Sequence, residues 1–151
     1  MNLQWEGKEE VSASREALWA FINDPYSVAH CVPDLVEAVV QDGHHVEATV
    51  KVGLGPVKGN FKLKIELQPQ AGGTHMGMKI SGGGLGSVVD LVAGADITDN
   101  GNATTTLDWK GTAEMRGQIA SLAGRVIDAQ ARRVINTTFA NVKAKCGSQS
   151  V

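Results

Sequence analysis

The chain has 151 residues, of which 42% are hydrophobic and 20% are charged, and its formal net charge is −2. A chain of this length predicts one domain that buries about 70% of its extended surface, and the charge excludes the basic footprint of a nucleic-acid-binding protein. No apolar run is long enough for a membrane-spanning helix and the N-terminus does not resemble a signal peptide, so we expect a cytoplasmic protein.

The N-terminal segment predicts a strand followed by two short helices. Residues Asn2 to Val11 alternate between two faces, as in a strand. Either Ser12 or Ser14 can cap the first helix, which ends before Pro25 because proline disfavours a helical residue in front of it. A second helix over about residues 26–31 follows.

Between residues 35 and 114 the apolar residues recur about every second position, which predicts a series of strands. The expected strands are Leu35 to Gln41, His45 to Val52, Val57 to Leu67, Thr74 to Ile80, Ser87 to Thr98 and Ala103 to Glu114. The glycine run at 82–86 is followed by a strand pattern and not by a helix, so it does not predict a dinucleotide-binding loop.

The last long stretch predicts one amphipathic helix. Its apolar residues recur at steps of three and four, so we expect a helix from Met115 to Lys145, roughly 45 Å long. Small residues such as Gly117 leave room beside its N-terminal half. We expect a domain over 1–146 and a disordered tail over 147–151.

The order of these elements predicts an α+β fold. Six consecutive strands with short connections form a meander, and the first strand joins one edge to give a seven-stranded antiparallel sheet. Only the long helix is large enough to cover the apolar face, and glycines in the strands allow the sheet to curve around it. This is the helix-grip arrangement.

Four segments of the chain carry a family resemblance. They are MNLQWEGKEEVSASREALWAFINDPYSVAHCVPD, VKVGLGPVKGNFK, LDWKGTAEMRG and GQIASLAGRVID. Together they resemble the CoxG family of carbon monoxide dehydrogenase subunits, a branch of the START-like (SRPBCC) superfamily, from Met1 to about Phe139. The chain has Asp34 where the family commonly has glycine, so we expect a different loop shape there.

The resemblance implies an accessory protein and not a catalyst. Its START-like fold implies an internal pocket for a hydrophobic small molecule, such as a lipid or a quinone. The family implies an association with a molybdenum hydroxylase of the carbon monoxide dehydrogenase type, and a transient contact with the inner membrane surface. It implies no cofactor of the chain's own.

The inward rows of the predicted strands and helix supply the candidate pocket. Methionine adapts to changing neighbours, which suits Met76 and Met78 to this role. The candidate lining residues are Phe61, Met76, Met78, Leu85, Val89, Leu91, Leu107, Trp109, Ile119, Leu122 and Val126. The same side chains are also compatible with a filled core, in which case the function would lie on the outer face.

On that outer face, lysines recur along one predicted strand. Lys58, Lys62 and Lys64 share it, and Lys51 lies on the neighbouring strand. Such a row is compatible with an ordinary solvated surface, or with docking to an acidic partner or an anionic membrane.

The chain predicts no catalytic or metal site. His30 and Cys31 are neighbours in a helix and therefore point about 100° apart. His44, His45 and His75 lack metal-ligand spacing. The alternative function is a small cyclase- or aromatase-like enzyme acting on an apolar aromatic or polyketide substrate, which requires at least two polar groups inside the pocket. The predicted inner rows contain almost none.

Overall fold

The structure is a computed structural model that describes residues 1–149. The strands are β1 (Asn2–Val11), β2 (Leu35–Asp42), β3 (His45–Leu54), β4 (Val57–Pro69), β5 (His75–Gly84), β6 (Ser87–Asp99) and β7 (Thr105–Gly117). The helices are α1 (Arg15–Ile22), α2 (Pro25–Ala29), the 3₁₀ helix η1 (Gln118–Ser121) and α3 (Gly124–Gln149). Of the expected tail, residues 147–149 belong to α3, and residues 150–151 lie outside the described residues.

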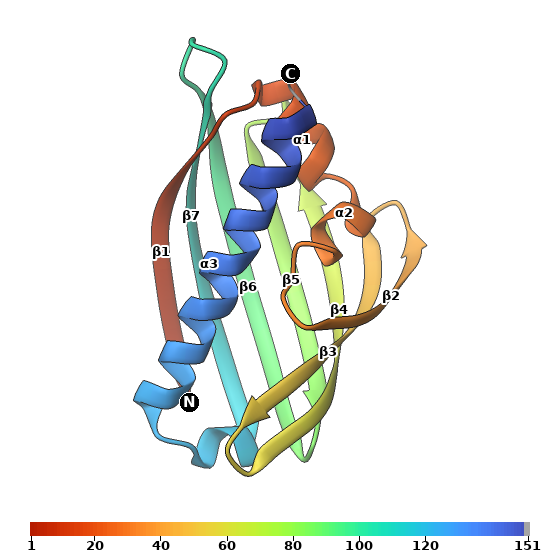
Figure 1. Cartoon of the computed structure of the whole chain (residues 1–151), viewed down its shortest axis with the longest axis vertical. Helices are drawn as coiled ribbons and strands as arrows, with labels where there is room; N and C mark the ends of the chain where they lie inside the picture. The colour runs from red at the N-terminus through yellow and green to blue at the C-terminus, as the bar shows by residue number, and fades with distance from the viewer. Residues whose placement is uncertain (150–151) are drawn as a thin grey trace.

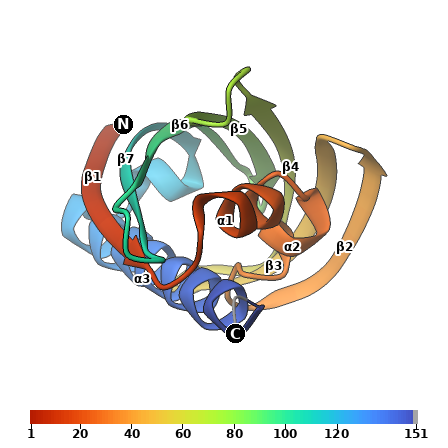
Figure 2. The same ribbon diagram turned by 90° about the horizontal axis from the view of Figure 1, so that it is seen from above.

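The strands form one antiparallel sheet in the order β1-β7-β6-β5-β4-β3-β2, with β1 paired to β7 from Asn2 opposite Glu114 to Val11 opposite Thr105. Seen from above, the strands describe an arc, and α3 lies across its open side (Figure 2). The predicted seven-stranded helix-grip fold is therefore confirmed. Along its length α3 approaches β1 and α1 (Figure 1).

The two short helices begin at local caps. The Ser14 hydroxyl accepts a hydrogen bond from the backbone N–H of Ala17 at 3.1 Å, so Ser14 is the cap of α1. Asp24 accepts one from Tyr26 at 3.3 Å, and Pro25 occupies the first turn of α2.

The prediction that the long helix begins at Met115 is wrong. Met115 ends the inward row of β7, Ile119 lies in η1, and α3 begins only at Gly124. The four-residue step from Met115 to Ile119 is compatible with a helix and also with every second position of a strand. The spacing alone therefore did not distinguish the end of β7 from the start of a helix. Gly117, with a φ of 83°, turns the chain between the strand and η1.

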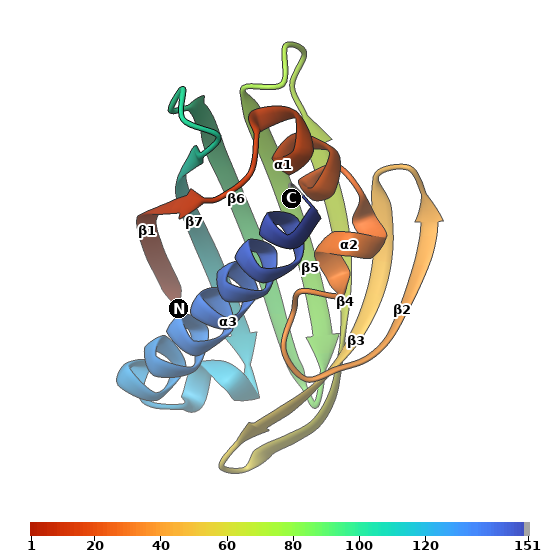
Figure 3. The ribbon, with the colours of Figure 1, turned by 45° about the horizontal axis from the view of Figure 1, so that its top comes forward.

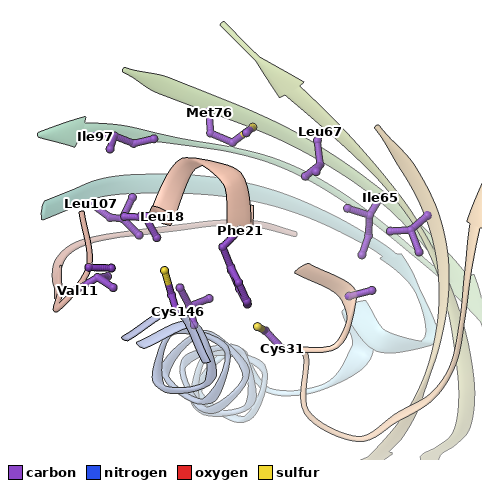
Figure 4. Close-up of a cluster of buried hydrophobic side chains, with 14 of the residues drawn as sticks. Val11, Leu18, Phe21, Cys31, Ile65, Leu67, Met76, Ile97, Leu107 and Cys146 are labelled. Atoms are coloured by element: carbon purple, nitrogen blue, oxygen red, sulfur yellow. The ribbon is translucent and has the colours of Figure 1, made fainter. Parts of the chain in front are cut away.

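Side chains from α1, α2 and the end of α3 fill one end of the arc. Val11, Leu18, Cys31 and Cys146 are fully buried there and, with their neighbours, form what we call the upper cluster (Figure 4). The Asn141 amide donates to the Cys31 carbonyl at 2.8 Å and so fixes α3 to the turn after α2. Figure 3 shows the C-terminal end of α3 beside α1. This end of the molecule is a packed core.

Within residues 1–149, no helix combines the length and the apolarity that crossing a bilayer requires.

Candidate ligand-binding site

The middle of the concave face is less buried than its position suggests. Val89 and Leu91 on β6, and Met78 and Ile80 on β5, face α3 but are only partly buried. Val92 occupies the opposite face of β6 and is 54% exposed. Because solvent does not reach an inward side chain through the sheet, the accessible surface of these residues faces the space between the sheet and α3.

Small residues occupy many of the inward positions in this region. They are Gly82, Ala93, Ala95, Gly111 and Ala113. A Cβ on Gly111 would lie 3.4 Å from the Ala93 Cβ, which is an ordinary contact distance. The central strands therefore have short side chains on the face toward α3, which leaves space between the sheet and the helix. The predicted lining residues were chosen for their size and so did not include these small residues, although the alternating pattern of the strands places them on the inward face.

The predicted lining residues fall into three groups. Those beside the second buried cluster, which we call the lower cluster, are Phe61, Val89, Leu91, Trp109, Ile119 and Leu122. Those that belong to the upper cluster are Met76, Met78 and Leu107. Leu85 and Val126 belong to neither, and they are 37% and 41% exposed.

The Leu85 side chain, in the turn between β5 and β6, nevertheless packs over Gly59 of β4. A Cβ on Gly59 would lie 2.7 Å from Leu85 Cδ2, so Gly59 leaves the space that this side chain occupies. Leu85 itself has a positive φ of 55°, an uncommon conformation for leucine. The turn thus holds an apolar side chain at the rim of the concave face.

Trp5 is a member of the lower cluster that the lining prediction did not include. It lies on β1 opposite Gly111 of β7 and is 6% exposed. Its indole N–H donates to Asp128 Oδ1 of α3 at 2.8 Å. Hydrogen bonds from Arg132 and then from Trp5 lower the pKa of Asp128.

Glu9 is an inward titratable residue that the lining prediction did not include. It shares the inward face of β1 with Trp5 and Val11, and its side chain is 22% exposed. Its carboxylate accepts hydrogen bonds from the Trp109 indole at 3.3 Å and from Lys143 Nζ at 2.9 Å. A carboxylate therefore lies at the edge of the interior, where its hydrogen bonds join β1 to Trp109 of β7 and to Lys143 of α3.

A cleft of about 200 Å³ separates β1 from α3. Residues 5–9 of β1 and Trp109 of β7 form one side, and Arg132, Ile135 and Asn136 of α3 form the other. A Cβ on Gly7 would lie 2.9 Å from Trp109 Cζ2, so only glycine at that position lets the indole lie against β1. The cleft and the lower cluster share Trp5, Trp109 and Ile135.

His30 and Cys31 do not form a nucleophile and its base. The His30 Nδ1 lies 2.8 Å from the Tyr26 carbonyl oxygen, and its ring stacks on Tyr26 with centroids 4.0 Å apart. Cys31 is fully buried, and burial raises the pKa of its thiol, which disfavours the reactive thiolate.

His45 and His75 lie outside the space between the sheet and α3. His45 contacts Asp42 at 2.7 Å and Glu66 at 3.1 Å, and His75 contacts Asp96 at 2.7 Å. In the part of the chain that the structure describes, no three His, Cys, Asp or Glu side chains form a group that could hold a metal ion.

The family model of the carbon monoxide dehydrogenase subunit CoxG matches residues 7–147. A conserved protein from Geobacillus kaustophilus is similar in structure, with a TM-score of 0.87, 21% identity and coverage of 99% of this chain and 98% of that chain. A START superfamily protein from Mycobacterium smegmatis gives a TM-score of 0.75 at 12% identity, over 97% and 98%. The comparison with curated proteins gave no match.

An enzyme also has this fold. A point mutant of norcoclaurine synthase from Thalictrum flavum, in complex with a transition-state analogue, is similar with a TM-score of 0.65 and 12% identity, over 100% of this chain and 98% of that chain. At such identities the solved structures show a shared START-like fold and do not show a shared activity.

Proposed function

Because the chain belongs to the CoxG family of carbon monoxide dehydrogenase subunits, we propose that it is a non-catalytic accessory protein that carries a hydrophobic small molecule between its sheet and α3. One observation carries the proposal: Val89, Leu91 and Met78 face α3 and yet keep accessible surface. Apolar surface left open to water costs about 25 cal/mol per Å², so an apolar guest that covers it stabilises the protein.

The side chains around this space favour a guest without charge. Phe61, Leu91 and Ile119 of the lower cluster are apolar, and Met78 on β5 is flexible enough to fit guests of different shape. Trp109 provides a flat surface on which a ring can stack. A lipid- or quinone-like molecule matches these walls.

Native mass spectrometry of the freshly purified protein, followed by organic extraction, tests the carrier function. We expect a bound mass that disappears after extraction and an apolar compound in the solvent phase. If the measured mass is that of the polypeptide alone, and the protein also fails to bind an environment-sensitive apolar dye, the proposal is contradicted.

We further propose that the partner is a molybdenum hydroxylase of the carbon monoxide dehydrogenase type, met in the cytoplasm at the inner face of the membrane. The exposed lysines of β3 and β4 support a docking surface for an acidic partner or an anionic membrane, since the Lys62 side chain is 72% exposed and makes only a long ion pair, at 3.8 Å, with Glu47. Comigration with such a hydroxylase in size-exclusion chromatography at low salt, and its loss at high salt, is the expected result.

A second candidate function is a cyclase- or aromatase-like enzyme that acts in the same interior. Glu9 favours it, because an inward carboxylate beside Trp109 is positioned as a general base would be. Incubation with an aromatic polyketide, analysed by mass spectrometry, separates the two functions. The enzyme predicts a product that Glu9→Gln abolishes, and the carrier predicts unchanged compound.

A further inference from the structure

We propose that β2, at the open edge of the sheet, binds an extended segment of a partner protein as an additional strand, and that this segment has apolar residues flanked by lysine or arginine. The proposal concerns the outer rim of the molecule, so it goes beyond the carrier function and does not depend on it. It assigns a role to Val36, Val39 and Val40, three exposed apolar residues that the interior does not use.

The two edges of the sheet differ in what lies beside them. β1 is one edge, and α3 runs along it, held by the hydrogen bond from Trp5 to Asp128 at 2.8 Å. β2 is the other edge, where β3 pairs with one side of the strand and α2 lies on its concave face (Figure 2). Every second residue of an edge strand directs its N–H and C=O groups away from the neighbouring strand, where another chain can pair with them.

Exposed valines make the β2 edge apolar. Val36, Val39 and Val40 are 51%, 52% and 44% exposed. Val39 lies opposite Glu47 on the outward face, and Val40 lies on the inward face, so both faces of the strand offer an apolar side chain to a neighbour. Shifts in the register with β3 confine the regular stretch to residues 37–40. Lysine and proline, which commonly protect open edges, do not occur in β2.

The charges beside these valines argue against a second copy of this chain. Residues 34–47 include four carboxylates and no lysine or arginine; the carboxylates are those of Asp34, Glu37, Asp42 and Glu47. In a symmetric antiparallel pairing of two β2 strands centred on Ala38, Val36 would lie opposite Val40, but the two Glu37 carboxylates would be diagonal neighbours on one face. Like charges across a strand pair are destabilising. The edge therefore matches itself in shape and repels itself in charge.

A basic segment of another protein replaces this repulsion by attraction. Glu37 is exposed within the regular stretch, and Asp42 is exposed at the end of the strand. A segment that runs antiparallel to β2 and has the sequence Arg-Thr-Val-Val-Val-Lys sets its arginine opposite Asp42, its valines opposite residues 38–40 and its lysine opposite Glu37. Main-chain hydrogen bonds then supply affinity, and the side chains on either face supply specificity.

The test measures binding of this hexapeptide, labelled with fluorescein through a Gly-Ser linker, by fluorescence anisotropy. We expect saturable binding to the parent protein and about tenfold weaker binding to Val39→Lys, which sets a cation against the basic segment. Val92→Lys is the matched control, because Val92 is 54% exposed on the same outward face but lies on β6, in the middle of the sheet. It should bind the peptide as the parent does. Equal affinity of the two variants, or no binding by the parent, would overturn the proposal.

Two further peptides distinguish an added strand from a contact made by side chains alone. Both have the same sequence, and each is N-methylated on alternate residues, so that the methyl groups of the two peptides occupy opposite edges of the extended chain. An added strand pairs through one edge only. We therefore expect one peptide to bind as the unmethylated peptide does and the other to fail. Equal binding of both would overturn the added strand.

Sedimentation velocity of the protein without peptide tests the second copy as the occupant. We expect the parent protein to sediment as a species that Val39→Lys does not change. A dimer that dissociates in Val39→Lys and persists in Val92→Lys would overturn the basic partner, because it would show that another copy of this chain occupies the β2 edge.

Discussion

Gly117 holds a backbone conformation that other residues adopt only with strain. Its φ is 83°, and a Cβ there would collide with the Gly86 carbonyl oxygen. We expect Gly117→Ala to lower the free energy of unfolding by about 1–3 kcal/mol, measured by urea denaturation. Gly124→Ala is the control, since nothing lies within 4 Å of a Cβ at the start of α3. A similar loss in both variants would contradict the expectation.

His45 makes the stability of the protein depend on pH. Hydrogen bonds to Asp42 and then to Glu66 raise its pKa above the ordinary value of 6.5. Protonated His45 is thus favoured in the folded state, so its contribution is complete below pH 6.5 and is lost as the pH rises through the raised pKa.

We therefore expect the free energy of unfolding to fall less between about pH 6 and pH 8 in His45→Gln than in the parent protein. Urea denaturation at a series of pH values measures the slope. A parent-like slope in His45→Gln would show that another group dominates.

Residues whose role is local were predictable, and those whose role depends on distant pairing were not. Ser14 and Asp24 cap helices within three residues of themselves, so the sequence contains the whole interaction. Glu9 shares the inward face of β1 with Trp5 and Val11, so its direction follows from the alternation of the strand. Its partners, Trp109 and Lys143, come from distant parts of the chain, and no pattern near Glu9 reveals them.

At the scale of single elements, the start of α3 was the main error. The inward row of β7 continues from Leu107 through Ala113 to Met115, and apolar Ile119 lies four residues further on, inside the 3₁₀ helix η1. Buried positions from the strand and from the 3₁₀ helix thus imitate helical spacing. Only the positive φ of Gly117 marks the boundary, and the sequence shows a glycine without showing its φ.

The lysine row on the outer face of the sheet makes a prediction for binding to membranes. We expect Lys58→Glu/Lys62→Glu/Lys64→Glu to lose cosedimentation with anionic phospholipid vesicles, since each lysine near such a surface contributes about 1 kcal/mol. The control triple variant, Lys8→Glu/Lys79→Glu/Lys110→Glu, changes the charge equally on other parts of that face.

We expect the control triple variant to keep most of the binding, and added salt to weaken the binding of the parent. An equal loss of vesicle binding in both triple variants would show that the net charge of the protein, and not the position of these lysines, determines the binding. Binding by neither parent nor control would remove the membrane from the proposed partners.

At the scale of the whole molecule, the carrier function depends on open space above the central strands. Ala93 faces α3 from β6, whereas Val92 beside it faces outward. We expect Ala93→Phe to fill part of that space and to reduce the apolar compound recovered by organic extraction, with only a modest fall in melting temperature. Val92→Phe should leave both unchanged.

A filled core would behave differently. Inserting a ring into well-packed surroundings costs about 1–3 kcal/mol or more, so Ala93→Phe would then unfold at a much lower temperature than Val92→Phe. That outcome would contradict an open interior.

The topology was predictable because it follows from the order of elements and the shortness of the turns. The degree of burial was not, because the accessible surface of Leu91 depends on where α3 crosses the sheet. That crossing is set by contacts between residues far apart in the chain, such as Trp5 with Asp128 and Asn141 with Cys31.

The pairing of β1 with β7 bears on how the chain folds during synthesis. Asn2 pairs with Glu114, so β1 waits during synthesis for β7, the last of the seven strands. At about 5–20 residues per second, β1 remains without its partner strand for several seconds or more. Closing so long a loop is entropically costly, so we expect the docking of β1 to be a late step and nascent chains that stop before β7 to be prone to aggregation.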